Sequence, residues 1–594
     1  MAISPVTEEI DLVSYTILSN GKEIPSTYEI VSIQIVQQLN RISEAEIILI
    51  DGSVTKQKFD VAESNTFVPG AEIEIKLGYH GKDDSVYKGL VIKQNLIINH
   101  DSSTRLRIIC KDHALKMTVC KNSAIYTNAT DGSILKTLIQ NSGLSADVAT
   151  TTEEHKEVVQ YCTTDWDFLV TRAEVNGLVV LTDNGKVVIS KPAVSGSPVL
   201  EVEYGRDVYA FDGELDATFQ YSEAKRNSWD MSTQKVIEAT SSEPTVNKQG
   251  NISGKKLSEV LDAGATLLSS SAAITNDTLS TWANATVLKS RLSRFKGTLT
   301  FQGSSKATAN STISLKGLSD RFNGDAFISG VTHLIENGTW LTEVRLGLEN
   351  KWFAETNQAA APMASGLIPG VKGLQTGVVK KIDEDPDNQF RVQVEIPLLN
   401  AENEAVWARL STFYASNTFG AYFMPEIGDE VILGFMNDDP RFPIILGSVY
   451  SSKLPAPETP NKENTIKTLV TKSKLQLKFD DEKKIITVLT PSGNTMVFSD
   501  EDEAITVSDQ NSNKITMNRD GISLESPSNI AIKATQDVSI KGATISINGD
   551  RSIDASGGNV AISAEMSASL KGSADCAISS DGNLTAKGLM VLIN

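Results

Sequence analysis

Acidic side chains form the two densest groups of potentially reactive residues in this 594-residue chain. One group contains Asp383, Glu384, Asp385 and Asp387, and the other runs from Asp500 to Glu503. Paired carboxylates act as acid and base in glycoside hydrolysis when burial separates their pKa values. Both groups lie between predicted strands, where solvated turns carry such charges, and neither has the alternating ligands and central glycine of a calcium loop. We therefore predict no catalytic or ion-binding role for them.

The histidines, cysteines and glycines form no recognisable catalytic or metal motif. The five histidines stand alone in strand-like or loop-like segments and end at His333, so a histidine-held metal near the C-terminus is excluded. The four cysteines include no Cys-x-x-Cys pair, and no phosphate-binding Gly-x-x-x-x-Gly-Lys-Ser/Thr motif occurs. We expect no catalytic residue, no cofactor and no metal, and therefore a protein that is not an enzyme.

The acidic balance of the chain argues against nucleic acid as a partner. The formal charge is −19, with 40% hydrophobic and 22% charged residues, a composition typical of folded chains. Phosphate binding requires concentrated Lys and Arg. The N-terminal stretch lacks a basic segment followed by an apolar run, and no stretch approaches the roughly eighteen apolar residues of a membrane span. We expect a protein made without a signal peptide, so that any export would bypass the ordinary signal route.

The last eighty residues repeat a short apolar-polar-apolar unit every seven or eight residues. Alternation with period two predicts strands with one buried face, and glycines such as Gly542 and Gly549 provide bends between them. A single-chain β-helix needs roughly twenty residues per coil, so three intertwined chains are predicted to close this thread into a trimeric β-helix. The apolar pairs are Ile515/Met517, Ile522/Leu524, Ile530/Ile532, Val538/Ile540, Ile545/Ile547, Ile553/Ala555, Val560/Ile562, Ala568/Leu570, Cys576/Ile578 and Leu584/Ala586.

Two shifts in composition divide the chain. Residues 354–372 are small, polar and turn-forming, and residues 453–464 are rich in proline, which a central strand does not tolerate. We predict a hub domain at 1–353, a linker at 354–372, a small barrel at 373–452, a Pro-rich linker at 453–464 and a needle at 465–594.

The hub is predicted to be strand-rich, with some helix. Helices are expected near residues 133–142 and 256–272. A further helix after Thr164 has strong local signals, because Thr164 is a good cap, Asp167 lies three residues later and Gly177 suits the C-terminal end. The predicted strands are 13–19, 28–36, 44–51, 72–79, 90–98 and 105–112.

The small barrel is predicted from five short strands separated by turn-rich segments. Val392, Val394 and Ile396 alternate as one apolar face, and five strands of this length are typical of an OB-fold barrel. A core position is the preferred interpretation of Trp407, with stacking on sugars or bases as the alternative. The strands are 376–382, 390–396, 405–411, 429–435 and 443–450.

Spaced motifs in the barrel and the hub resemble one family of proteins. The barrel motif contains Arg391, Trp407, Arg409, Pro425, Gly428, Asp429 and Gly447, and the hub motif contains Tyr161, Asp165, Phe168, Arg172 and Gly177. Together with the repetitive C-terminus, they resemble VgrG and phage-tail spike proteins of contractile injection systems. The hub motif is most similar to spikes of extracellular phage-tail-like injection particles.

The resemblance implies a mainly β protein with tube-like barrels in the hub, an OB barrel and a trimeric β-helix needle. It implies a homotrimeric, structural spike whose hub contacts a tail tube (Hcp-like) and baseplate, and which punctures the target envelope when the sheath contracts. Effector cargo is a further possible partner, and a target membrane is met only on firing. The resemblance also implies a PAAR-type tip protein at the needle end.

The C-terminal residues favour the same partner. They are strongly apolar and would form a platform around the axis of a trimer, and an exposed apolar end marks a partner site. The predicted tip-binding residues are Leu589, Met590, Val591, Leu592, Ile593 and Asn594.

The alternative function is a polysaccharide-binding or polysaccharide-degrading tail protein, since OB barrels also host oligosaccharide sites. A type VI secretion apparatus, an extracellular injection particle and a phage tail are all compatible with this sequence.

Overall fold

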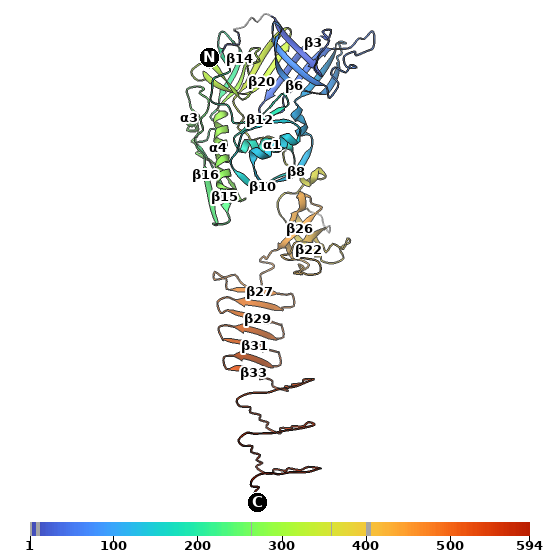
Figure 1. The fold of residues 1–594 in the computed structure, drawn as a ribbon, viewed down its shortest axis with the longest axis vertical. Helices are drawn as coiled ribbons and strands as arrows, with labels where there is room; N and C mark the ends of the chain where they lie inside the picture. The colour runs from blue at the N-terminus through green and yellow to red at the C-terminus, as the bar shows by residue number, and fades with distance from the viewer. Residues whose placement is uncertain (1–2, 7–11, 263, 358, 400–404, 594) are drawn as a thin grey trace. The chain divides into compact units, whose positions relative to one another are not determined.

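The computed structural model describes residues 3–6, 12–262, 264–357, 359–399 and 405–593 (Figure 1). The chain forms two compact units, Met1–Val449 and Tyr450–Asn594. The described residues are mainly β with a few helices, as predicted. None of the helices among them is both long and apolar enough to cross a membrane.

A 13-stranded sheet forms the framework of the first unit. Its first half holds β1 (Val13–Ser19), β2 (Lys22–Glu23), β3 (Ile30–Gln38), β4 (Glu44–Ile50), β5 (Glu72–Tyr79), β6 (Lys82–Ile98) and β7 (Thr104–Lys111). Its second half holds β13 (Leu200–Glu203), β14 (Val208–Leu215), β18 (Phe295–Gln302), β19 (Ser311–Lys316), β20 (Gly324–Glu336) and β21 (Thr339–Leu346). All six strands predicted for this region are therefore confirmed.

The two halves have separate apolar cores and one shared seam. Alternating side chains such as Ile35, Ile47 and Ile75 fill the first core, and Leu299 and Ile313 belong to the second. Antiparallel pairing of β20 with β3, from Gly330 opposite Gln38 to Glu336 opposite Ser32, joins the halves.

A smaller α/β region lies between the two halves in sequence. It contains η1 (His113–Thr118), β8 (Lys121–Thr130), α1 (Asp131–Asn141), β9 (Ser145–Val148), β10 (Glu154–Thr164), α2 (Asp165–Val175), β11 (Val179–Asp183) and β12 (Lys186–Ser190). Helix α2 begins as predicted, because Thr164 accepts a hydrogen bond from the Asp167 amide. It also ends as predicted, with Gly177 at φ +66° and its amide bonded to Glu174.

The predicted helix at 256–272 is wrong. This segment contains only the short α3 (Gly254–Ser258), followed by β17 (Ala265–Ser270), which pairs with β15 (Glu223–Asp230) beside β16 (Lys235–Thr240). The main helix of this region is α4 (Asn276–Leu292), capped by Thr275. Leu279, Ala283 and Val287 recur every four residues on its buried side, a signal that the sequence does carry.

The barrel contains the five predicted strands. They are β22 (Gln375–Lys381), β23 (Val392–Glu395), β24 (Val406–Leu410), β25 (Glu430–Phe435) and β26 (Pro443–Ser448), closed in the order β22-β23-β24-β26-β25. Val392, Val394 and Ile396 are buried in its core. Two short helical elements precede β22 in the chain, α5 (Phe353–Thr356) and η2 (Met363–Gly366). Two more follow strands of the barrel: η3 (Pro397–Leu399) comes after β23, and η4 (Met436–Asp438) comes after β25.

The second unit begins with a seven-stranded antiparallel meander (Figure 1). Each strand pairs with the next one along the chain. The strands are β27 (Ile466–Val470), β28 (Gln476–Asp480), β29 (Ile485–Leu489), β30 (Thr495–Ser499), β31 (Ala504–Ser508), β32 (Lys514–Asn518) and β33 (Gly521–Glu525). Ile515/Met517 and Ile522/Leu524, assigned above to the short repeat, therefore belong to this meander.

The short repeat itself occupies the described residues 526–593. In this stretch the chain forms no strand and makes no backbone–backbone hydrogen bond within itself. The predicted pairing between chains is not tested by a single chain.

Candidate functional site

One face of the meander is almost entirely apolar. The strand register places Leu469 opposite Leu477, Ile486 opposite Phe498 and so on down the sheet, so the apolar side chains form one continuous surface. The members of this surface are Leu469, Leu477, Phe479, Ile486, Val488, Met496, Phe498, Ile505, Val507, Ile515, Met517, Ile522 and Leu524. We call it the needle face.

The opposite face of the meander is mixed, with apolar residues such as Ile485 and Val497 beside polar ones. Thr487, Thr506 and Thr516 alternate with the residues of the needle face, and Lys478 lies among them. The needle face nevertheless stays open to solvent in one chain, with Val488 42% exposed and Ile522 71% exposed. A continuous exposed apolar surface of this extent is typical of an interface with a partner.

The short repeat continues this apolar character beyond the meander. Ile530/Ile532, Val538/Ile540 and Ile545/Ile547 are all at least half exposed. Backbone amide and carbonyl groups that become buried require hydrogen-bond partners, and this segment makes no such bonds between its own backbone groups. Neighbouring copies of the chain would supply both the missing pairing and the cover for the apolar side chains.

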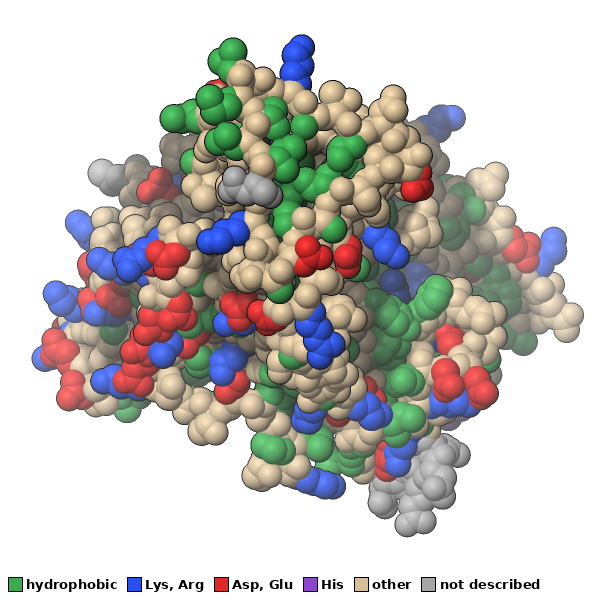
Figure 2. Space-filling view, turned by 90° about the horizontal axis from the view of Figure 1, so that it is seen from below, with side chains coloured by type: hydrophobic (Ala, Val, Ile, Leu, Met, Phe, Trp, Pro, Cys, Tyr) green, Lys and Arg blue, Asp and Glu red, His purple; other side chains and the backbone are tan. Residues whose placement is uncertain are grey.

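The predicted tip residues lie at the end of the described chain. Leu589, Leu592 and Ile593 are more than four-fifths exposed, and Met590 and Val591 are also exposed. Asn594 lies outside the described residues. Hydrophobic side chains also reach the surface in several patches between charged groups in Figure 2.

The barrel motif stabilises two turns of the barrel. The Arg391 guanidinium bonds to Asp385 at 2.6 Å and to Asp387 at 2.5 Å, and it lies over the Trp407 ring. Hydrogen bonds from Arg391 and from backbone amides lower the pKa of Asp385. Trp407 is therefore half-buried against Arg391, whereas its neighbour Ala408 faces the core, so the core interpretation of Trp407 is wrong.

The remaining barrel-motif residues shape the entrance to β25 or lie on strands. Asp429 accepts a hydrogen bond from the Glu426 amide at 2.9 Å, directly after Pro425. Gly428 has φ +93°, a conformation that favours glycine, and its amide bonds to Val379. Arg409 is exposed on β24, and Gly447 pairs with Ile432 between β26 and β25.

The hub motif surrounds a buried carboxylate that sequence analysis missed. Arg172 donates two hydrogen bonds to Asp131 at 2.8 and 2.7 Å, and His155 and Asn176 also contact it. Burial alone would raise the pKa of Asp131, but the hydrogen bonds and charge of Arg172, with the other two contacts, lower it. Asp131 starts α1, so this network holds α1 and α2 together.

The other hub-motif residues are not gathered at one point. Phe168 is buried, and Asp165 accepts hydrogen bonds from Asn122 and Gln160. Tyr161 is 66% exposed on β10. The motif therefore combines core, cap and surface positions.

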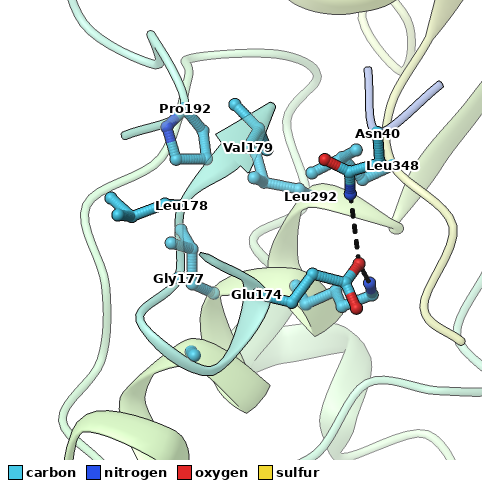
Figure 3. Close-up of a pocket in the computed structure, with 11 residues that line it drawn as sticks. Asn40, Glu174, Gly177, Leu178, Val179, Pro192, Leu292 and Leu348 are labelled. Atoms are coloured by element: carbon cyan, nitrogen blue, oxygen red, sulfur yellow. Dashed lines mark hydrogen bonds and ion pairs between the residues drawn. The ribbon is translucent and has the colours of Figure 1, made fainter. Parts of the chain in front are cut away.

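Glu174 is a second structurally important carboxylate without a sequence signal. It accepts a hydrogen bond from Asn40 at 3.2 Å (Figure 3). It also accepts hydrogen bonds from Lys289 at 2.5 Å and from the Phe353 amide at 2.6 Å. These contacts join α2, α4 and α5. The adjoining cavity of about 30 Å³ has room for a water molecule, far below the roughly 300 Å³ of a ligand pocket.

The hub also has a wider groove of about 990 Å³. Its charges include three ion pairs: Lys289 with Glu174, Lys296 with Glu214, and Lys111 with Glu44. Acids and bases in the groove thus compensate one another rather than forming a field of one sign.

The acidic groups considered at the outset lie on turns. Lys381 pairs with Glu384, Lys483 pairs with Glu501, and Asp502 accepts a hydrogen bond from Ser499. Across the described residues, no three His, Cys, Asp or Glu side chains gather in a geometry suited to a metal ion.

Comparison with known protein families matches both C-terminal domains of the chain. Residues 375–450 match the type VI secretion system/phage-baseplate injector OB domain, and residues 485–560 match the phage baseplate V C-terminal trimerisation domain. The closed barrel and the apolar needle face fit these two matches. Together they define a trimeric spike of the VgrG and phage-baseplate class.

The N-terminal part of the chain matches a separate family model. The chain belongs to the family of the Alg8 N-terminal domain, whose model matches residues 9–337, more than half of the chain.

Individual relatives match only short parts of the chain. The type VI secretion system spike protein VgrG1c of Pseudomonas aeruginosa is 36% identical over 110 residues, which are 17% of this chain and 15% of the relative. The actin cross-linking toxin VgrG1 of Vibrio cholerae is 31% identical over 105 residues, 16% of this chain and 10% of the relative. The match thus spans less than a sixth of the length of either relative.

Among solved structures, the chain is similar to the 43 kDa tail protein of prophage MuSo2 from Shewanella oneidensis. It is 14% identical, covers 57% of this chain and 99% of its own, and has a TM-score of 0.44.

Proposed function

We propose that this chain is the puncturing spike of a contractile injection system. In this proposal the hub contacts a tail tube and baseplate, and three needles combine into one rigid shaft that carries the force of sheath contraction. The needle face supports it, because further copies would cover an exposed apolar sheet face that continues into an unpaired apolar repeat. A shaft whose strand edges are all paired resists local unfolding.

The first test is the solution mass of the full chain. Light scattering coupled to size exclusion should give three times the 64.1 kDa of one chain. A mass equal to that of a single chain under the same conditions would contradict the shaft.

The apolar residues 589–593 are proposed to bind a PAAR-type tip protein. The side chains of Ile593 and Leu589 are at least 90% exposed, and this exposure supports a partner at this position. Leu592→Asp should abolish capture of a PAAR protein from the same genome by the purified trimer. The control Thr585→Asp, on the polar side of the Leu584/Ala586 unit, should bind normally. Equal binding by both variants would contradict the tip assignment.

We further propose a structural rather than catalytic role, with the assembled protein reaching the extracellular space or a target cell. The carboxylates at 383–387 support this role, because Asp385 is occupied by Arg391 and three backbone amides rather than paired with a second acid in a cleft. The competing function is polysaccharide binding or cleavage. Saturable glycan binding or bond cleavage by the purified trimer would favour it.

A further inference from the structure

The connection between β24 and β25 forms an uncharged aromatic projection on the barrel. From Ser411 to Pro425 it contains no Asp, Glu, Lys, Arg or His. Five of its aromatic side chains are exposed: Phe413 by 87%, Tyr414 by 55%, Phe419 by 60%, Tyr422 by 80% and Phe423 by 56%. We call residues 411–425 the aromatic finger.

The aromatic finger has a defined backbone structure. Ala415 and Gly420 form an isolated antiparallel bridge, and the Ala421 amide bonds to the Tyr414 carbonyl at 2.8 Å. The Ser416 amide bonds to the Phe419 carbonyl at 2.9 Å, and the rings of Tyr414 and Phe419 lie 6.0 Å apart. Its aromatic side chains are thus presented on a hairpin-like turn and do not fold back into the barrel core.

Several other large apolar side chains of the barrel are also exposed, including Phe390, Leu398, Ile427 and Phe442. An apolar surface of this kind on a soluble protein marks a contact with a partner.

We propose that the aromatic finger packs against the barrel of a second copy of this chain within the trimer. The inference rests on the trimeric state and not on tip binding or puncturing. Barrel and needle are joined by residues 449–465, a connection that spans at most about 60 Å when fully extended. Three barrels are therefore tethered to one shaft, which keeps each finger at an effective concentration of roughly millimolar relative to the other barrels.

Charge favours the same partner. Each chain carries −19, and three copies repel one another wherever acidic surfaces meet. The finger is a long uncharged surface on each barrel, so contact there avoids that repulsion. Aromatic side chains also bury large areas with little loss of conformational freedom.

Site-specific photo-crosslinking in the full-length trimer tests this contact. Phe413 is replaced by benzoylphenylalanine, and the matched control carries the same group at Asp383, in the acidic β22–β23 loop. Irradiation should convert the Phe413 protein into covalent dimers and trimers on a denaturing gel. Peptide mapping should place the second attachment within residues 373–452, and the Asp383 protein should remain monomeric on the gel.

Three results would overturn the proposal. The first is an equal yield of crosslinked product from the Phe413 and Asp383 positions, and the second is no interchain product from a protein that light scattering shows to be trimeric. The third comes from a parallel irradiation with added phosphatidylethanolamine/phosphatidylglycerol vesicles, if the probe attaches only to lipid. Failure of crosslinking with the trimer mass intact leaves the spike function standing, so the two proposals fail separately.

Discussion

The needle contains two regions that differ in whether the backbone forms strand pairs within one chain. In residues 466–525 each strand pairs with its neighbour in the same chain, through connections of four or five residues in most cases. In the described residues 526–593 the repeat is shorter, and no such pairing occurs within the chain. Both regions nonetheless present an exposed apolar surface.

This difference in strand pairing accompanies a change in repeat length. A unit of about ten residues holds a five-residue strand and a turn long enough to reverse the chain, so an antiparallel hairpin forms. A unit of about eight residues leaves only two or three residues for the turn, as between β32 and β33. In residues 526–593 we expect each chain to progress around a common axis and to take its hydrogen bonds from other copies.

The largest expected effect comes from a charge within the short repeat. Ile547→Asp would bury three carboxylates near one another in the shaft, at a cost on the order of several kcal/mol per copy. We expect the trimeric species to be lost in light scattering. Ser546→Asp, on the alternate side of the same unit, should remain trimeric. A trimeric Ile547→Asp protein would show that the repeat does not form an interchain core.

Hydrogen exchange in the Ile547→Asp protein should separate the two regions directly. Residues 466–525 should retain slowly exchanging amides, because their partners lie in the same chain, and residues 526–593 should exchange at nearly unprotected rates. In the wild-type trimer both regions should be protected. Mass spectrometry of proteolytic peptides measures this, and uniform loss of protection along the needle would contradict the distinction.

Acid should distinguish the hub from the needle, which contains no histidine. Burial lowers the pKa of His333 to about 4, so below pH 6.5 the unfolded chain binds a proton that the folded hub excludes. The hub should lose up to about 3 kcal/mol of unfolding free energy between pH 6.5 and pH 4 from this residue.

His333→Asn tests the acid effect, since asparagine has an amide atom near the position of Nδ1, which contacts Thr342 at 2.9 Å. Denaturant midpoints at pH 7 and pH 4.5 should differ less in this variant than in the wild-type protein. Equal changes in both proteins would contradict the assignment.

The smallest expected change in stability comes from a substitution in a turn of the meander. Gly493 lies between β29 and β30 with φ +93°, so Gly493→Ala should cost about 1–2 kcal/mol per copy through backbone strain. Gly447→Ala is the matched control, because a Cβ there also meets open space but φ is not in the left-handed region. Thermal unfolding should show a lower midpoint for Gly493→Ala only.

Much of this fold can be predicted from local sequence patterns. The barrel strands, the cap at Thr164 and the αL glycine at 177 follow from short-range rules, because neighbouring residues alone create those interactions. The predicted helix at 256–272 is wrong because its residues depend on a long-range interaction. Its apolar residues belong to a strand that gains stability from pairing with β15, a partner distant in sequence.

The sequence by itself determined the apolar stripe of the needle, the five-stranded barrel and the motif residues, because periodicity and turn chemistry are local properties. Only the tertiary structure decided that β27–β33 pair within one chain, and that Asp131 and Glu174 bind side chains far away in sequence. It also decided that Trp407 faces Arg391 and that the aromatic finger stays exposed. These features depend on which segments meet in space, and long-range contacts leave no fixed spacing along the chain.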